Sequence, residues 1–280
     1  MRVATKRLGK HIGAEVTLGD DAALFDDWTA REVLEALEDN TVLVFRELHL
    51  DDASQVAFSR KLGEVLILGS ARPEPGNAYP EIFKVTLNKE QNPVADYLKA
   101  TFFWHIDGAT DETPTKASLL TARQIGDGTG DTEFASTYAA YDALSDEDKQ
   151  RFERVRVVHS LEASQRLLRP DPSPQELKGW RSRPPREHPL VWTHLNGRKS
   201  LVLGATASHV VGISEQEGRA LLGRLLEWAT CRDFVYRHHW REGDLVIWDN
   251  RGALHRALPY GSDSRRLMHR TTLLGDEPIQ

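Results

Sequence analysis

The sequence predicts a mostly β fold with helical insertions, of the double-stranded β-helix (jelly-roll) type. Short runs of β-branched and aromatic residues recur along the chain, and only a few amphipathic segments separate them. No Gly-x-Gly-x-x-Gly phosphate loop is present. A barrel or double sheet fits this pattern better than alternating βαβ units. We expect residues 1–280 to form a single domain, because β-rich domains of this size often stay undivided.

Strands are expected where apolar or β-branched residues cluster between turn residues. Thr41–Glu47 (TVLVFRE) is a clear case, since it is β-branched and follows Asn40. The Asn196-Gly197 pair marks a hairpin turn. The expected strands are Ala14–Leu18, Thr41–Glu47, Glu81–Leu87, Ala100–Ile106, Lys116–Arg123, Thr132–Ala135, Arg154–His159, Pro189–Thr193, Ser200–Leu203, Asp233–His239, Asp244–Asp249 and Arg266–Leu274.

Helices are expected where apolar residues recur every three to four positions. Ser214–Thr230 is the clearest, because Ser214 and Glu217 have the spacing of a capping box. Asp52 and Gln55 have the same spacing at the start of another helix. The expected helices are Thr29–Leu37, Asp52–Leu62, Thr137–Phe152 and Ser214–Thr230, the last with an apolar face of Leu221, Leu222, Leu225 and Trp228.

One long segment, Gln165–Pro189, has no clear period and is rich in Arg and Pro. It is expected to be a long loop that either connects neighbouring strands or acts as a lid. Long loops in compact domains are often functional, which makes this segment a candidate lid.

Composition and charge exclude several classes of protein. The net charge is −6, from 36 Lys and Arg against 42 Asp and Glu, so we expect no nucleic-acid partner. No stretch approaches the roughly 20 apolar residues of a membrane span, and no signal-like apolar run follows the basic N-terminus. Cys231 is the only cysteine, which rules out an intramolecular disulfide. We therefore expect a cytoplasmic protein without a membrane partner.

Two His-x-Asp sequences are the first sign of a metal centre. On a strand, residues i and i+2 point to the same face, so this motif supplies two ligands at once. His49–Asp51 leads into a helix, where Asp51 suits N-capping. His105–Asp107 lies in an aromatic, strand-like run instead, where two inward ionisable groups require a partner. His105 and Asp107 are therefore the candidate metal ligands.

A mononuclear iron oxygenase needs two histidines and one carboxylate, so the second histidine must come from elsewhere. His255 is favoured by its setting in WDNRGALHRALP, between two expected strands. His238 and His239 are adjacent on a strand, so their side chains point oppositely and do not easily chelate one metal. The remaining candidates are His159, His188, His194, His209 and His269.

The last expected strand carries a pair of arginines. Strand alternation places Arg266 and Arg270 on one face, with Arg265 and His269 on the other. Two arginines inside a barrel are costly unless they meet anions. Guanidinium groups bind carboxylates through two parallel hydrogen bonds, which suits a dicarboxylate cosubstrate.

Together, these residues resemble the taurine dioxygenase/TfdA family of iron(II)- and 2-oxoglutarate-dependent oxygenases. The resemblance spans nearly the whole chain, and its motifs occur in a compatible order. The matching pieces are KRLGKHIGAEV, VAFSRKLGEV, WHIDG, GDTEFAS (Gly130–Ser136), HPLVWTH (His188–His194), GDLVIWDNRGALHRA (Gly243–Ala257) and RRLMHRTTLLGD (Arg265–Asp276).

The resemblance implies a jelly-roll dioxygenase that uses Fe(II), 2-oxoglutarate and O2 and releases succinate and CO2. By motif, the iron ligands map onto His105, Asp107 and His255. Arg266 lies at the family's place for binding the far carboxylate of 2-oxoglutarate, and Thr132 matches the threonine that assists it. Arg270 matches the arginine that binds the substrate's acidic group. Self-association is common in the family, which implies a homo-oligomer acting on a small molecule.

Three positions depart from the family's pattern. Thr101 stands four residues before the first iron ligand, where Asn is common, and the other two bear on the substrate. Leu68 stands where a histidine would meet the sulfonate, which argues against taurine as substrate. Gly108 follows Asp107 where a larger side chain is common, which implies a roomier pocket near iron. We expect a larger, partly hydrophobic substrate with one anionic group.

Two other functions remain compatible with a three-ligand metal site. One is a zinc-dependent hydrolase or isomerase on a cupin-like barrel, with a metal-bound water. The other is a non-catalytic barrel that binds a small acid or a partner protein. The zinc enzyme has no obvious need for Arg266 and Thr132, and neither alternative explains the full set of motifs as well as the oxygenase does.

Overall fold

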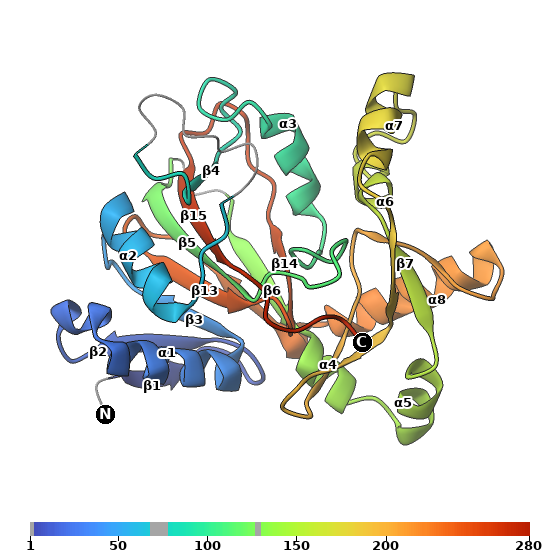
Figure 1. Cartoon of the computed structure of the whole chain (residues 1–280), viewed down its shortest axis with the longest axis horizontal. Helices are drawn as coiled ribbons and strands as arrows, with labels where there is room; N and C mark the ends of the chain where they lie inside the picture. The colour runs from blue at the N-terminus through green and yellow to red at the C-terminus, as the bar shows by residue number, and fades with distance from the viewer. Residues whose placement is uncertain (1–2, 68–77, 127–129) are drawn as a thin grey trace.

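The chain folds around two β-sheets that pack face to face (Figure 1). It is described by a computed structural model, which covers residues 3–67, 78–126 and 130–280. Within these residues the larger sheet has seven strands in the order β1-β2-β3-β13-β5-β15-β4, antiparallel except for β2 with β3. They are β1 (Val3–Arg7), β2 (Ala14–Leu18), β3 (Val42–Phe45), β4 (Phe83–Val85), β5 (Ala117–Gln124), β13 (Leu245–Asp249) and β15 (Leu267–Leu273).

The smaller sheet has the order β12-β6-β14 and closes the barrel. Its strands are β6 (Thr132–Ser136), β12 (Val235–His238) and β14 (Ala253–Ala257). Apolar side chains from both sheets meet in one core, where the rings of Phe134 and Trp248 lie 5.5 Å apart. Each such buried side chain contributes about 1.5–3 kcal/mol of hydrophobic stabilisation. The expected jelly roll is confirmed.

Two helices cover the outer face of the larger sheet (Figure 1). They are α1 (Asp27–Asn40) and α2 (Asp52–Leu62). The expected Asp52–Gln55 capping pair is wrong: Asp51 caps α2 by accepting the backbone N–H of Ser54 at 2.7 Å. Gln55 is instead buried and donates to the His269 carbonyl at 3.0 Å, which ties α2 to β15.

The residues between β6 and β12 form a second layer around a separate core. Its helices are α4 (Thr137–Asp142), α5 (Asp146–Phe152), α6 (Leu161–Arg166), α7 (Pro174–Arg181) and α8 (Glu215–Ala229), followed by the short 3₁₀ helix η3 (Arg232–Phe234). Its strands are β7 (Arg156–His159), β8 (Arg186–Pro189), β9 (Val191–Thr193), β10 (Lys199–Leu201) and β11 (Ala207–Val210). The capping box of Ser214 and Glu217 on α8 is confirmed.

Several sequence-based expectations for this layer need correction. Gln165–Pro189 is not a loop, because it contains α7, which has a complete Ser173–Glu176 capping box, and β8. The helix expected over Thr137–Phe152 is two helices, because Ser145 caps α5 through the Asp148 N–H and starts a new axis.

The chain before the candidate metal ligands also differs from expectation. Ala100–Ile106 is not a strand: α3 (Ala95–Leu98) runs into the 3₁₀ helix η2 (Lys99–Phe102). The Thr101 hydroxyl donates to the Leu98 carbonyl at 2.7 Å, a local bond that favours the turn over an extended chain. Strands β1, β8, β11 and β14 were not anticipated, and η1 (Asp21–Phe25) completes the described elements. Among the described residues, no helix combines the length and apolarity needed to cross a bilayer.

Candidate metal and cosubstrate site

Backbone pairing brings the two candidate histidine ligands together. His255 lies on β14, and His105 forms an isolated antiparallel bridge with it. Each residue donates its N–H to the other's carbonyl, at 3.0 and 2.9 Å. Directly opposed residues in an antiparallel pair project to the same face, and the two imidazole centroids lie 4.1 Å apart. Gly204 lies so close to this bridge that only glycine fits there, since a Cβ would lie 2.7 Å from the Trp104 carbonyl oxygen.

Asp107 completes a triad with the two histidines. Its Oδ1 lies 3.8 Å from His105 Nε2, and its Oδ2 lies 3.8 Å from His255 Nε2. All three ligand atoms fall within 4.8 Å of one another. In the part of the chain that the structure describes, no other group of three His, Cys, Asp or Glu residues comes this close. Two imidazoles and one carboxylate are the donor set of a facial iron triad.

The protonation states of the triad suit a divalent cation. Burial lowers the pKa of His105, and burial together with His105 lowers the pKa of His255 further, so both rings are neutral. His105 Nδ1–H donates to the Phe103 carbonyl at 2.8 Å, which leaves Nε2 as the ligand nitrogen. Burial alone would raise the pKa of Asp107, but the charge of Arg270 holds it well below its usual value. A neutral pair of imidazoles beside an ionised carboxylate therefore fits a bound metal.

Arg266 is buried directly before β15, four residues from Arg270, and part of its guanidinium has no partner among the described residues. Its side chain is 1 % exposed, and its Nε and Nη1 find no hydrogen-bond partner among the described residues. The guanidinium carbon lies 4.7 Å from the centre of the Tyr260 ring. Gly130 allows this packing, because a Cβ there would lie 2.7 Å from Arg266 Cδ. Unpaired buried guanidinium donors are costly, so this cradle suits an anionic ligand.

Thr132 is buried on β6, where it pairs with Ala257, two residues beyond His255 on β14. Its Oγ1 accepts the indole N–H of Trp240 at 3.0 Å. Since the indole can only donate, the threonine hydroxyl keeps its own hydrogen for another acceptor.

Arg270 reaches the metal ligands themselves. Its Nη1 lies 3.1 Å from Asp107 Oδ2, and its guanidinium carbon lies 5.3 Å from the centre of the Phe83 ring. Arg270 therefore points to the triad side of β15, whereas His269 faces α2 and contacts Asp52 at 2.6 Å. Arg266 directly precedes this strand.

Two expected pocket residues have a different outcome. Leu68 lies outside the described residues. Gly108 has a positive φ of 81°, and a Cβ there would lie 2.9 Å from Pro114 Cα and from the Thr115 N. The backbone of Pro114 and Thr115 therefore fills the space beside Gly108, and a turn explains the glycine better than a roomier pocket does.

The other histidines offered by the sequence take part in separate contacts. His194 pairs with Glu277 at 2.6 Å and His238 with Asp244 at 3.1 Å. His159 and His188 face one another at 5.8 Å on β7 and β8. The alternative motif at His49 is excluded, because its Asp51 is the N-cap of α2.

Sequence reasoning missed Ser118 and Asn250. The Ser118 hydroxyl donates to Asp107 Oδ2 at 3.1 Å, and Asn250 donates to Ser118 at 3.2 Å. A serine within the otherwise apolar start of β5 (ASLL) was the available signal, since a buried hydroxyl requires a partner.

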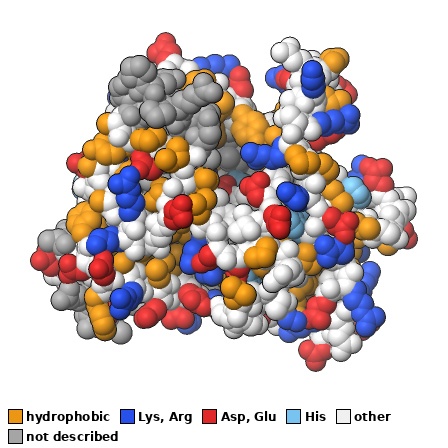
Figure 2. Space-filling model, in the orientation of Figure 1, with side chains coloured by type: hydrophobic (Ala, Val, Ile, Leu, Met, Phe, Trp, Pro, Cys, Tyr) orange, Lys and Arg blue, Asp and Glu red, His pale blue; other side chains and the backbone are white. Residues whose placement is uncertain are grey.

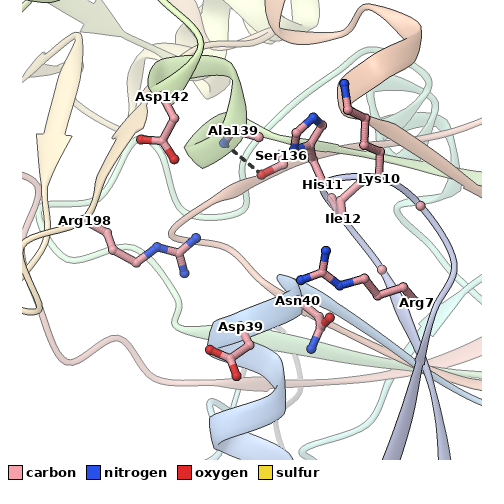
Figure 3. Close-up of a pocket in the computed structure, with 12 residues that line it drawn as sticks. Arg7, Lys10, His11, Ile12, Asp39, Asn40, Ser136, Ala139, Asp142 and Arg198 are labelled. Atoms are coloured by element: carbon pink, nitrogen blue, oxygen red, sulfur yellow. Dashed lines mark hydrogen bonds between the residues drawn. The ribbon is translucent and has the colours of Figure 1, made fainter.

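A polar pocket of about 170 Å³ lies away from the triad, between the β1–β2 turn, the end of α1 and the start of α4 (Figure 3). Arg7 and Arg198 extend toward it from different elements, while Asp39 and Asp142 also line it. Its mixed charge favours no particular ligand, and it contains none of the predicted site residues.

The fold and the triad define a jelly-roll protein with a metal centre of the two-histidine, one-carboxylate type. The family described as "Taurine catabolism dioxygenase TauD, TfdA family" matches residues 4–272. The chain belongs to this family, and it is therefore a dioxygenase.

Named relatives and solved structures agree with that assignment. The chain is 38 % identical to the alpha-ketoglutarate-dependent 2,4-dichlorophenoxyacetate dioxygenase of Cupriavidus pinatubonensis, over 89 % of this chain and 90 % of the relative. It is 32 % identical to the (S)-phenoxypropionate/alpha-ketoglutarate-dioxygenase of Sphingobium herbicidovorans, over 94 % and 92 %. It also matches the crystal structure of AAD-2 in complex with Mn(II) and N-oxalylglycine, with a TM-score of 0.84, 34 % identity and complete coverage of both chains.

Proposed function

We propose that this protein is an Fe(II)- and 2-oxoglutarate-dependent dioxygenase that hydroxylates a C–H bond of a small, anionic and partly hydrophobic substrate. Succinate and CO2 are the products of the cosubstrate. Two observations carry the proposal. The ligand atoms of His105, Asp107 and His255 lie within 4.8 Å of one another, and the Nε and Nη1 of the buried Arg266 have no hydrogen-bond partner among the described residues. The dependence on 2-oxoglutarate named for several relatives supports it.

His105, Asp107 and His255 would hold the iron, which, with 2-oxoglutarate bound, supplies the activation of O2. Arg266 is proposed to bind the far carboxylate of 2-oxoglutarate through its unpartnered Nε–H and Nη1–H. Thr132 would donate its free hydroxyl hydrogen to the same carboxylate. The buried walls around Arg266 exclude water, which strengthens both contacts.

Arg270 is proposed to bind the acidic group of the substrate beside the metal ligands. Its Nε has no described partner, so the guanidinium retains donors for an anion. The substrates named for relatives support this choice, since 2,4-dichlorophenoxyacetate and phenoxypropionate join an aromatic ring to a carboxylate. One relative is named a sulfate ester dioxygenase. Aryloxy acids and alkyl sulfates are therefore the first substrates to screen.

The zinc hydrolase and the non-catalytic barrel gain no support. The zinc hydrolase gives Arg266 no task, and no relative reported above is named for either activity. We further propose that the protein works in the cytoplasm as a homo-oligomer. The self-association that the family resemblance implies is the ground for this proposal. Size-exclusion chromatography with light scattering tests it.

The α6–α7 segment remains a candidate lid within the single domain. It projects from the second layer, and the molecular surface is hollowed beside it (Figures 1 and 2). Substrate is expected to protect Gln165–Pro189 from proteolysis, and an unchanged digestion pattern would argue against closure.

The first experiment is an anaerobic titration of metal-free protein with Fe(II) and 2-oxoglutarate, followed by visible spectroscopy. A weak metal-to-ligand charge-transfer band is expected, absent in His255→Ala and weakened in Arg266→Ala. His209→Ala and Arg265→Ala are matched controls, since both residues are exposed and outside the site. Iron binding without a band in the wild-type protein would refute the oxygenase assignment.

A further inference from the structure

A buried chain of hydrogen bonds runs from β13 to the carboxylate of Asp107. The indole N–H of Trp248 donates to Asn250 Oδ1 at 2.8 Å. Asn250 Nδ2 lies 3.2 Å from Ser118 Oγ and 3.0 Å from Thr115 Oγ1. Ser118 Oγ then lies 3.1 Å from Asp107 Oδ2.

The direction of every bond in this chain follows from its first member. An indole nitrogen can only donate, so the amide oxygen of Asn250 must face Trp248. The Asn250 NH2 group then faces the hydroxyls, and Ser118 Oγ must accept from it. The Ser118 hydrogen is therefore directed to Asp107, which as a carboxylate can only accept. The indole N–H of Trp248, which can only donate, thus fixes the hydrogen-bond directions from Asn250 through Ser118 to Asp107.

The pairing of β5 with β13 places the members of this hydrogen-bond chain next to one another. Ser118 on β5 is the direct partner of Trp248 on β13, so their side chains share a face. The ladder continues one step beyond β13, where the Asn250 N–H donates to the Lys116 carbonyl at 2.9 Å. Asn250, two residues after Trp248, returns to the same face. Trp248, Asn250 and Ser118 are at most 2 % exposed, so water does not compete.

Asp107 needs such support because its own backbone lies in a turn. Gly108 has a positive φ, and Asp107 itself belongs to no strand. A second contact from the same network holds this turn, since Thr115 Oγ1 donates to the Asp107 carbonyl at 3.4 Å. Trp248 also packs against the second histidine, with ring centroids 4.7 Å apart. The hydrogen-bond chain therefore links the Asp107 carboxylate to Trp248, whose ring packs against His255.

We propose that Ser118 and Asn250 are positioning residues, which hold the Asp107 carboxylate in the orientation that binds the metal. This inference rests on the proposed function. Ser118 directs one carboxylate oxygen, and Asn250 fixes the Ser118 hydroxyl so that it cannot rotate away. Without the bond from Ser118, Arg270 is the one described side chain that still hydrogen-bonds to the Asp107 carboxylate, at 3.1 Å. The orientation of the carboxylate is then less restricted, and the metal site loses preorganisation.

The test is the affinity of the metal-free protein for Co(II) or Mn(II), measured without cosubstrate or oxygen. Ser118→Ala and Asn250→Ala are each expected to weaken metal binding by about 10- to 100-fold, the usual effect of losing a residue that supports a ligand. The double variant should be little weaker than either single one, because both act through one hydrogen bond. Ser118→Thr, which keeps the hydroxyl, should recover most of the affinity.

Ser59→Ala is the matched control. Ser59 is also fully buried, and its hydroxyl contacts Thr271 at 2.7 Å, outside the site. It should lower thermal stability and leave metal affinity unchanged. Equal loss of affinity in Ser59→Ala and Ser118→Ala would attribute the effect to general destabilisation and overturn the inference, as would unchanged affinity in Ser118→Ala. Failure of the wild-type protein to bind metal would instead refute the proposed function.

Discussion

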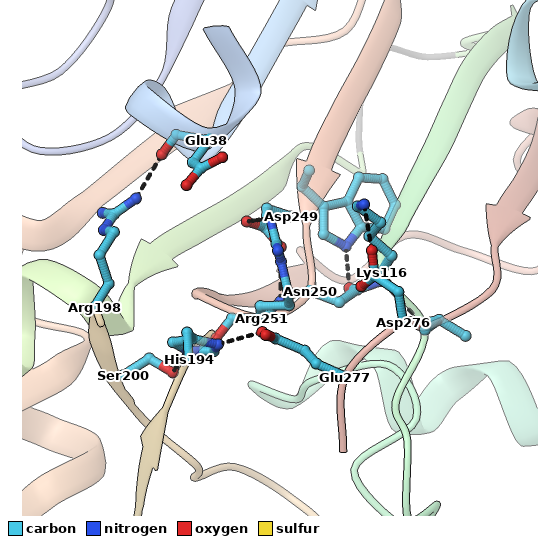
Figure 4. A network of polar contacts seen from close by, with 12 residues as sticks. Glu38, Lys116, His194, Arg198, Ser200, Asp249, Asn250, Arg251, Asp276 and Glu277 are labelled. Atoms are coloured by element: carbon cyan, nitrogen blue, oxygen red, sulfur yellow. Dashed lines mark hydrogen bonds and ion pairs between the residues drawn. The ribbon is translucent and has the colours of Figure 1, made fainter. Parts of the chain in front are cut away.

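Two buried polar regions lie on either side of the β13–β14 connection, and they differ in how completely their charges are partnered. In the first (Figure 4), Arg251 donates to both oxygens of Asp249, at 2.9 and 3.0 Å. His194 likewise has both ring nitrogens engaged, by Glu277 at 2.6 Å and by Ser200 at 2.8 Å. This network needs no ligand to be complete.

The second region is the metal and cosubstrate site, where the same kinds of groups remain open. Arg266 Nε and Nη1, Arg270 Nε and His255 Nδ1 have no partner within the described chain. Buried polar groups are normally satisfied, so open ones mark either a cost or a ligand site. The comparison predicts that disrupting the first region lowers stability, whereas disrupting the second lowers ligand binding.

The largest effect is expected from a matched pair of arginine substitutions. Arg251→Leu leaves the buried Asp249 carboxylate unpaired and should lower the free energy of unfolding by about 3–5 kcal/mol. Arg266→Leu removes a buried charge that has no carboxylate partner, so the stability of the ligand-free protein should be unchanged or higher. Urea denaturation of both metal-free variants measures this difference.

The affinity for 2-oxoglutarate should respond to the substitution of Arg266 and not to that of Arg251. Arg266→Leu is expected to weaken 2-oxoglutarate binding by about 10- to 100-fold, which corresponds to the loss of charge-assisted hydrogen bonds. Arg251→Leu, kept well below its melting temperature, should retain the affinity. Comparable destabilisation by both substitutions would remove the distinction between the two regions.

Local signals in the sequence predicted part of the fold and of the candidate site, but contacts between distant residues left no such signal. The apolar runs of β3, β5 and β13 and the His-x-Asp motif are local signals, and they predicted the barrel and two ligands. The setting of His255 and the family motif around it predicted the third ligand. The bridge between His105 and His255 depends instead on pairing between residues 150 positions apart in the chain. β14 (ALHRA) is short and only weakly alternating, so its pairing with β6 was not visible locally. Ser118 and Asn250 became recognisable only once the β5–β13 register placed them together.

The next effect should come from the His194–Glu277 contact near the C-terminus. Glu277 is 4 % exposed, and its second oxygen accepts the Leu195 N–H at 3.1 Å. Glu277→Ala therefore leaves two donors, His194 Nδ1–H and the Leu195 N–H, without an acceptor and should cost about 1–3 kcal/mol of stability. Glu277→Gln keeps one acceptor oxygen and should cost less. Both variants should form the Fe(II)–2-oxoglutarate band normally, and loss of the band would show that this network also supports the site.

The smallest effect tests a buried histidine that belongs to neither region. His159 on β7 is fully buried, its Nε2 has no described partner, and burial together with the neighbouring His188 lowers its pKa from 6.5 to about 3. Below pH 6.5, His159 binds a proton in the unfolded chain but stays neutral in the folded protein. The contribution of His159 is therefore fully present above pH 6.5 and declines as the pH falls, by about 1.4 kcal/mol per pH unit.

His159→Phe should remove this acid sensitivity, because the ring no longer titrates. Between pH 7 and pH 5.5, the variant is expected to lose about 1.4 kcal/mol less stability than the wild-type protein. Urea denaturation at the two pH values measures the difference, with the exposed His209→Phe as control. The same pH dependence in His159→Phe and in the wild-type protein would mean that the folded chain accommodates the proton. A buried nitrogen without a partner would then not by itself show that the folded protein loses stability there. In that case only the 2-oxoglutarate binding measurement could identify Arg266 as part of a ligand site.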